Sequence, residues 1–220
     1  MSHKAQMKVI TSGPHRLFIL FSIILSLVAP TSILAQENRA ACSNECISDY
    51  GQVLGTTKNG LKAYSNCNSK CVIFEPNKYD GTYTGIKWQC VEFARRWLLA
   101  NHGVVYGDVD YAIDIWDKID FYTHVDTRKK IPVSSHLNGS KQAPAAGDLF
   151  IYAKAFLGTG HVAVITNIDK ENKQIMLGEQ NYKNTRWTDH FARKIDYIVR
   201  DGHYWILDPY LIGWKHAPFE

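Results

Sequence analysis

The sequence predicts a domain of the α+β class, in which one helix comes early and a run of short strands comes late. The first observation is that apolar residues recur at helical spacing over 90–99. The second is that short apolar runs alternate with turn residues from residue 148 onward, as in an antiparallel sheet. Helices and strands that are segregated along a chain are typical of α+β domains.

The composition is that of a globular protein. The chain has 220 residues, which suits one domain and a leader, with 45% hydrophobic and 21% charged residues. The formal net charge is +4, without a stripe of clustered lysine and arginine, so we expect no nucleic-acid partner. A charge this small would only slightly favour approach to anionic surfaces such as membranes or cell walls.

The N-terminal segment resembles an export signal. Basic residues precede an apolar run over 17–28, and small and polar residues follow it. This order predicts a signal peptide over 1–35 with cleavage after Ala35, and therefore a secreted or periplasmic protein. The alternative is an uncleaved membrane anchor, although Pro30 interrupts the apolar stretch. In either case we expect membrane contact only through this leader.

The cysteines divide into two pairs and one remainder. Four of them follow a Cys-x3-Cys spacing twice: Cys42, Cys46, Cys67 and Cys71. In an oxidising compartment they predict two disulfides that staple the extension over 36–49 to the domain over 50–220. One arrangement is a ladder in which Cys42 pairs with Cys71 and the inner two pair with each other, but spacing alone leaves the connectivity open. A zinc site of four thiolates is the alternative.

The first half of the domain predicts loops and helices. Residues 72–87 contain glycine and proline among polar residues and predict a loop. A helix is expected to begin at about Cys90 and to stop at Gly103. The segment 111–123 is a second amphipathic stretch.

The second half predicts a sheet. Residues 132–146 are expected to be a loop. Short apolar runs between turn residues then predict successive antiparallel strands at 148–152, 161–165, 174–177, 197–199 and 204–207.

Three residues form a candidate catalytic set. Cys90 lies where a helix begins, so the helix dipole and unpaired backbone N–H groups would stabilise its thiolate. His161 starts a strand, with its ring expected at a sheet edge, and Glu179 ends the next strand. Adjacent antiparallel strands can bring the two together, with the histidine as general base and the glutamate orienting it. A nucleophile on a helix followed by a histidine and an acid on a sheet is the papain-like arrangement.

Each of these residues alone has a simpler structural interpretation. A free cysteine is commonly a buried core residue, and a lone histidine is more often structural. Glu179 by itself predicts a solvated acid or a turn residue. The three become a catalytic hypothesis only in combination.

The wider sequence resembles a known family. The segment 85–97 reads Gly-Ile-Lys-Trp-Gln-Cys-Val-Glu-Phe-Ala-Arg-Arg-Trp, and it is similar to the active-site helix of glutathionylspermidine amidase domains of the CHAP amidohydrolase family. Thr-Gly-His-Val-Ala-Val-Ile-Thr at 159–166 and Gly-Glu-Gln-Asn at 178–181 follow in the family's order. The resemblance covers roughly residues 50–216.

The resemblance implies roles for individual residues. It implies Cys90 as nucleophile, His161 as base and Glu179 as third member, with no metal and no cofactor. For the substrate, Arg95 could offer a cation to a carboxylate, although a salt-bridged arginine is the simpler interpretation. Two further candidates for substrate binding lie close to Cys90 in the sequence. They are Glu92, and Gln89, whose amide could stabilise an oxyanion.

The predicted function is that of a secreted cysteine amidohydrolase that works through an acyl-enzyme. The resemblance favours a small peptide–polyamine amide such as that of glutathionylspermidine. The export signal favours a peptidoglycan amide instead, cut by an amidase or endopeptidase. A third reading is a catalytically inactive CHAP binding module. The 220 residues contain no ATP-grasp synthetase domain of the kind that bifunctional members of the family carry.

Overall fold

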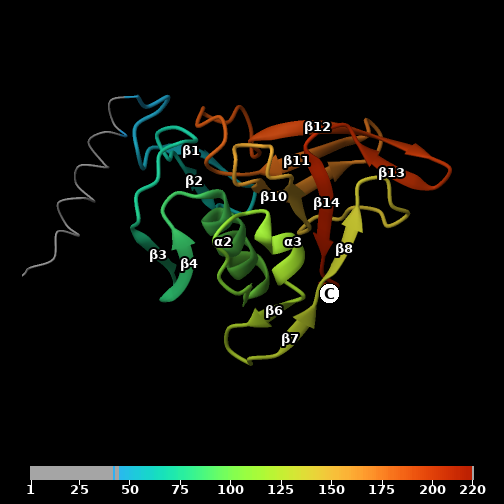
Figure 1. Ribbon diagram of the computed structural model, residues 1–220, viewed down its shortest axis with the longest axis horizontal. Helices are drawn as coiled ribbons and strands as arrows, with labels where there is room; N and C mark the ends of the chain where they lie inside the picture. The colour runs from blue at the N-terminus through green and yellow to red at the C-terminus, as the bar shows by residue number, and fades with distance from the viewer. Residues whose placement is uncertain (1–41, 43–44, 220) are drawn as a thin grey trace, which may run out of the picture. The chain divides into compact units, whose positions relative to one another are not determined.

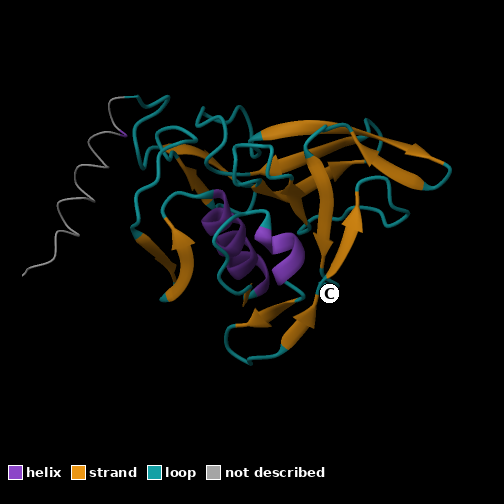
Figure 2. Cartoon of the chain, viewed as in Figure 1, coloured by secondary structure: helices purple, strands orange, loops and turns teal. Residues whose placement is uncertain are grey.

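The structure is a computed structural model that describes Cys42 and residues 45–219. These residues are mostly strand, with few helices, and they build a curled antiparallel sheet beside one long helix (Figures 1 and 2). The predicted signal peptide over 1–35 and most of the predicted extension lie outside the described residues. Among the residues described, no helix has the length and apolar character needed to cross a membrane.

Four short strands precede the long helix. β1 (Val53–Thr56) pairs with β2 (Lys62–Tyr64), and β3 (Pro76–Tyr79) pairs with β4 (Thr82–Ile86), both antiparallel. The loop predicted over 72–87 is therefore wrong for most of its length. Asp80 and Gly81 both have positive φ, of 46° and 77°, which is the geometry of a tight hairpin turn.

The long helix α2 (Cys90–His102) begins and ends where the sequence predicts. Gln89 is its N-cap with an extended backbone. Gly103 takes the left-handed conformation at φ 65°, and its N–H bonds back to the carbonyl of Leu99. The helix is not the first element of the domain, because β1–β4 come before it.

The amphipathic stretch at 111–123 is only partly helical. The elements after α2 are β5 (Val104–Val105), α3 (Asp114–Lys118), β6 (Phe121–His124) and β7 (Lys130–Pro132). The apolar positions Ile115 and Ile119 still reach the core. The helix stops because the next residues pair with β5 and β7 as a strand that buries Tyr122.

The main sheet has seven strands in the order β13-β12-β11-β10-β9-β14-β8. Their bounds are β8 (Ser134–Leu137), β9 (Leu149–Tyr152), β10 (His161–Asp169), β11 (Gln174–Gly178), β12 (Arg193–Arg200), β13 (His203–Ile206) and β14 (Leu211–His216). The five predicted strands are confirmed as β9 to β13. The loop predicted over 132–146 contains β8, which has no apolar alternation and becomes a strand by pairing with β14.

Apolar side chains fill both faces of this sheet. Side chains alternate along a strand, so in β9 Leu149 and Ile151 enter one core while Phe150 and Tyr152 enter the other. The first core is the one that α2 covers, mainly with Phe93 and its apolar neighbours along the helix. This packing places the start of α2 beside β10.

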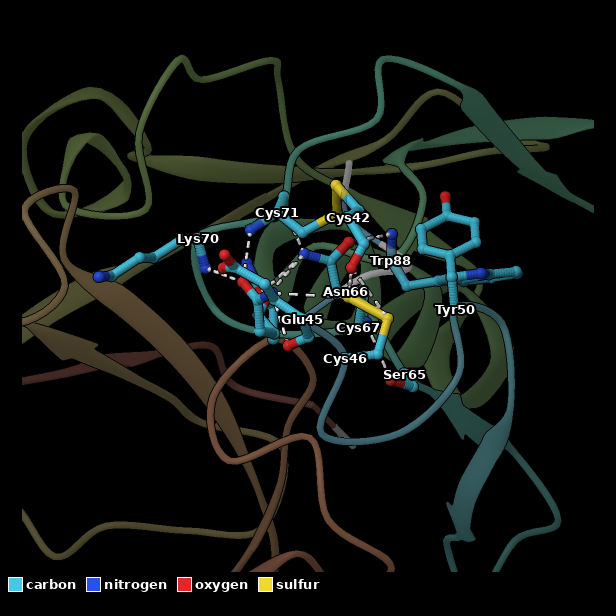
Figure 3. The surroundings of a disulfide bond; sticks show 12 residues. Cys42, Glu45, Cys46, Tyr50, Ser65, Asn66, Cys67, Lys70, Cys71 and Trp88 are labelled. Carbon is cyan, nitrogen blue, oxygen red and sulfur yellow. Dashed lines mark hydrogen bonds between the residues drawn. A yellow bond between two sulfur atoms is a disulfide. The ribbon is translucent and has the colours of Figure 1, made fainter. Parts of the chain in front are cut away.

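Two disulfides close the N-terminal part of the described chain (Figure 3). Cys42 pairs with Cys71, and Cys46 pairs with Cys67, with S–S distances of 2.01 and 2.13 Å. This is the ladder arrangement, so the four thiolates of a zinc site are not available. We call residues 42 and 45–73 the disulfide unit; its buried cysteines pack with Ile73 into a small core of their own.

Candidate active site

Cys90 lies at the first position of α2 with 8% of its surface exposed. It is the one cysteine without a disulfide in the part of the chain that is described. The first helical hydrogen bond runs from the N–H of Phe93 to the carbonyl of Gln89, at 3.1 Å, so the N–H groups before Phe93 have no acceptor inside the helix. The backbone N–H groups of Val91 and Val162 lie close enough to the Cys90 sulfur to lower the pKa of its thiol. The sulfur therefore lies between the start of α2 and the start of β10.

His161 opens β10 and is completely buried. The expectation that its ring lies at an open sheet edge is wrong. The rings of Tyr152, Phe156 and Tyr182 enclose it, with centroids 5.5, 5.9 and 5.7 Å away. Gly160 before it has φ 73° and lies so close to Tyr152 that an added Cβ would meet the Tyr152 carbonyl at 2.6 Å. The tight Gly160 turn and the aromatic side chains thus fix the position of the imidazole.

Glu179 follows β11 and meets His161. Its Oε2 accepts a hydrogen bond from His161 Nε2 at 2.8 Å. An ionised carboxylate can only accept, so Nε2 carries a hydrogen and Nδ1 is the acceptor in the neutral ring. Nδ1 is buried without a hydrogen-bond partner among the described residues, and it is the ring nitrogen available to a neighbouring thiol.

Arg193, at the start of β12, holds Glu179 from the other side. Its Nε donates to Glu179 Oε1 at 2.7 Å and its Nη2 donates to the Tyr152 hydroxyl at 2.7 Å. Its Nη1 donates to Asp208 at 3.1 Å. A charged chain therefore runs from Asp208 through Arg193 and Glu179 to His161.

The charges of the site support one another. Burial raises the pKa of the Cys90 thiol, but the charge of His161 and the hydrogen bonds to the sulfur together outweigh burial and lower that pKa. Burial lowers the pKa of His161, while the charge of Cys90 and the bond to Glu179 raise it, to about 9. Burial raises the pKa of Glu179, but the bond from His161 and the charge of Arg193 lower it overall. The site thus favours a thiolate beside an imidazolium, which titrate as a coupled pair.

The residues expected to bind substrate are engaged within the protein. Arg95 is 2% exposed and donates to Asp108 at 2.9 Å and to the carbonyl of Gly107 at 2.7 Å. Glu92 is fully buried and paired with Arg96 at 2.6 Å. Both arrangements are those of structural ion pairs.

Gln89 precedes Cys90, but its amide points into the protein. Its Nε2 donates to Asn66 Oδ1 at 3.2 Å and to the carbonyl of Cys71 at 3.4 Å. The amide thus connects the start of α2 with the disulfide unit.

Arg193 is a residue of the site that was not predicted from the sequence. The register of β11 with β12 sets Leu177 opposite Arg193, and this brings the arginine to the carboxylate two residues further on. The only signal in the sequence is a basic residue at the start of the strand that follows Glu179. It could be recognised only once the strand pairing is known.

The described residues can supply covalent catalysis from their own side chains. They combine a thiol of lowered pKa, a base with one free ring nitrogen, and backbone N–H groups at a helix start that could stabilise an oxyanion. Within residues 42 and 45–219, no group of three or more histidine, cysteine, aspartate or glutamate side chains is arranged to hold a metal.

Known proteins are similar in sequence to this part of the chain. Residues 79–181 match the CHAP domain. The chain is 34% identical over 187 residues to the bifunctional glutathionylspermidine synthetase/amidase of Escherichia coli, covering 75% of this chain and 29% of that protein. The protein of the same name from Shigella flexneri matches equally. The trypanothione synthetase of Crithidia fasciculata is 33% identical over 160 residues, covering 72% of this chain and 24% of that protein. This chain thus spans less than a third of the length of these relatives.

Proposed function

Because residues 79–181 of this chain form a CHAP domain, we propose that the protein is a secreted cysteine amidohydrolase with Cys90, His161 and Glu179 as its catalytic residues. One observation carries the proposal. A free thiol of lowered pKa lies at a helix start beside a buried histidine that is hydrogen-bonded to a carboxylate. The fold in this proposal is papain-like, with the nucleophile at the start of the helix that packs on the antiparallel sheet.

The first step forms an acyl-enzyme. The Cys90 thiolate attacks the amide carbonyl, and the carbonyl oxygen takes the negative charge. Backbone N–H groups at the start of α2 stabilise this oxyanion. The imidazolium of His161 gives its Nδ1 proton to the amine as the carbon–nitrogen bond breaks, which leaves a thioester on Cys90.

The second step releases the acid. Neutral His161 accepts a proton from water through Nδ1, and the resulting hydroxide attacks the thioester. The carbon–sulfur bond breaks and the thiolate returns beside the imidazolium. Glu179 keeps Nε2 protonated throughout, so the same ring nitrogen serves as acid and as base.

The names of the relatives support one substrate class. Glutathionylspermidine joins a peptide carboxyl to a polyamine, and an amidase acts on that amide. We propose a small peptide–polyamine amide of this kind as the substrate, with its reactive carbonyl at Cys90.

The two disulfides favour a second candidate. Structural disulfides persist in oxidising compartments outside the cytosol, and many exported CHAP domains cut peptidoglycan. A peptidoglycan amidase or endopeptidase would use the same three residues and the same chemistry.

Hydrolysis by the purified chain tests the proposal. Glutathionylspermidine and purified peptidoglycan are offered separately, in a buffer that leaves the disulfides intact, and released amine or acid is measured. We expect one of them to be cleaved, and we expect Cys90→Ala and His161→Ala each to lower kcat by on the order of 10⁴-fold. His190→Ala, at an exposed histidine, is the matched control and should retain the activity.

The compound that is cleaved identifies the substrate class. Cleavage by wild type and by Cys90→Ala alike would remove the thiol from the mechanism. If neither compound is cleaved and a thiol-reactive probe does not label Cys90, the chain is better described as a binding module of the CHAP type.

A further inference from the structure

Three side-chain amides form a closed ring of hydrogen bonds next to the candidate site. Gln89 Nε2 donates to Asn66 Oδ1 at 3.2 Å, Asn66 Nδ2 donates to Asn181 Oδ1 at 3.0 Å, and Asn181 Nδ2 donates to Gln89 Oε1 at 2.6 Å. Within the ring, each amide donates one hydrogen bond and accepts one. We call Asn66, Gln89 and Asn181 the amide ring.

The ring joins three segments that are far apart in the sequence. Gln89 immediately precedes Cys90, and Asn181 lies two residues after Glu179. Asn66 belongs to the disulfide unit and is central among the sticks of Figure 3. The ring thus connects the residue before the nucleophile to the segment that carries the third catalytic residue.

Asn66 is the most constrained member. It is fully buried, and its Oδ1 also accepts the backbone N–H of Trp88 at 3.3 Å. Its Nδ2 also donates to the carbonyl of Cys71, which receives Gln89 as well. Cys71, which accepts this bond, and Cys67, which follows Asn66 in the sequence, each form a disulfide. The anchor of the ring is therefore covalently fixed within the disulfide unit.

We propose that Asn66, through the amide ring, is a positioning residue that sets Cys90 against His161 and Glu179. This inference rests on the proposed amide hydrolysis. Hydrophobic packing fixes how closely α2 approaches the sheet, but apolar contacts have no preferred direction. Hydrogen bonds between three planar amides do, so the ring can fix the approach of Cys90 to His161.

The disulfide unit acquires a function from this arrangement. It supplies the third member of a ring whose other two members flank the catalytic residues. A polar ring that is fully satisfied specifies one arrangement, whereas an opened ring leaves buried donors and acceptors without partners. We therefore expect removal of Asn66 to disturb the chemistry at Cys90 in addition to lowering the stability of the fold.

The test measures the reactivity of Cys90 without any substrate. The rate of alkylation of the wild-type thiol by iodoacetamide is followed from pH 4 to 10 with the disulfides intact, beside kcat and KM for the amide that the wild type cleaves. For Asn66→Ala we expect kcat to fall by about 10–100-fold, as a misplacement of about 1 Å does, with KM within a few-fold. We also expect the alkylation midpoint to move up toward that of an ordinary thiol, because His161 no longer lies correctly beside the sulfur.

Asn138→Ala is the matched control. Asn138 bridges to the backbone of Ile206 through both its amide atoms, at 2.9 and 2.8 Å, and is not part of the amide ring. It should lower the melting temperature while leaving the alkylation profile unchanged. Where Asn66→Ala does not fold, Asn66→Asp keeps the shape and the acceptor but removes the donors.

A double variant separates a ring from independent contacts. If the ring acts as a unit, Asn66→Ala/Gln89→Ala loses no more kcat than the worse single variant. Losses that multiply would overturn the proposal and favour an independent role of Gln89 at the oxyanion. Alkylation profiles of Asn66→Ala and Asn66→Asp that match that of Asn138→Ala would also overturn it. Failure of the proposed hydrolysis would instead be seen in the wild type, which would label at Cys90 but cleave no amide.

Discussion

Two buried glutamate–arginine pairs of this protein differ in what surrounds them. Glu92 pairs with Arg96 one turn along α2, and Glu179 pairs with Arg193 across two strands. Both carboxylates are almost inaccessible to solvent. The amide of Gln180, next to Glu179, donates to Glu92 at 3.0 Å and connects the two sites.

The difference is in the remaining partners. Glu92 accepts hydrogen bonds from two amides, a hydroxyl and a guanidinium, and none of these is a histidine. The donors are Asn77, Gln180, Thr84 and Arg96. Glu179 receives His161, which can gain or lose a proton, and that histidine has a free buried nitrogen. Burial and an arginine are thus common to both pairs, and the titratable partner distinguishes the candidate site from a structural pair.

The largest expected effect comes from neutralising the acid at the site. Glu179→Gln keeps the shape of the side chain but removes the charge that stabilises the His161 imidazolium and fixes its tautomer. We expect kcat to fall by on the order of 10²–10⁴-fold, with a smaller change in KM. Steady-state kinetics on the cleaved amide measure both. An unchanged kcat would mean that Glu179 is as structural as Glu92.

Truncating the other acid should affect stability. Glu92→Ala leaves Arg96 buried without its carboxylate, and we expect the free energy of unfolding to fall by about 3–5 kcal/mol. Chemical denaturation measures this loss. Where the variant is still folded, its kcat should lie within a few-fold of wild type, since Glu92 has no contact with His161. A kcat loss as large as that of Glu179→Gln would abolish the distinction between the two pairs.

Removing the arginine of the site should have an intermediate effect. Arg193→Met deletes the charge that helps hold the pKa of Glu179 down, so that pKa rises. The Glu179 carboxylate is needed in its charged form, so activity is present above its pKa and is lost as the pH falls through it. We therefore expect about a tenfold loss of kcat and an acid limb that moves to higher pH. A pH–rate profile unchanged from wild type would show that Arg193 does not act through Glu179.

The smallest effect is expected at a pair that is half exposed. Arg95 is buried, but its partner Asp108 has 73% of its side chain exposed to solvent. We expect Asp108→Asn to change the free energy of unfolding by less than about 1 kcal/mol. The same denaturation measurement serves as a check. A loss of several kcal/mol would mean that the Arg95–Asp108 pair contributes as much to stability as the Glu92–Arg96 pair, despite the exposure of Asp108.

Local signals predicted the elements that carry the candidate catalytic residues. The bounds of α2 follow from helical periodicity and from Gly103, and β10 and β11 follow from their apolar runs. These signals place Cys90 and His161 at the starts of their elements. Because each signal depends on only a few neighbouring residues, it can be recognised in a single sequence.

Pairing between distant segments could not be predicted in this way. β3, β4 and β8 are polar strands whose existence depends on a partner strand. The contact of Arg193 with Glu179 depends on strand register. The sequence favoured a salt bridge for Arg95, but it did not identify the partner, Asp108, 13 residues further along the chain.

The disulfide unit places opposite redox requirements on one polypeptide. The four cysteines around Asn66 must stay oxidised, while Cys90 must remain a reduced thiol to act as a nucleophile. A strongly reducing medium keeps the Cys90 thiol reduced but breaks the disulfides of the disulfide unit. A strongly oxidising medium preserves these disulfides but oxidises Cys90. The protein therefore has a bounded range of ambient redox potential in which both conditions hold, and activity should pass through a maximum as that potential is varied.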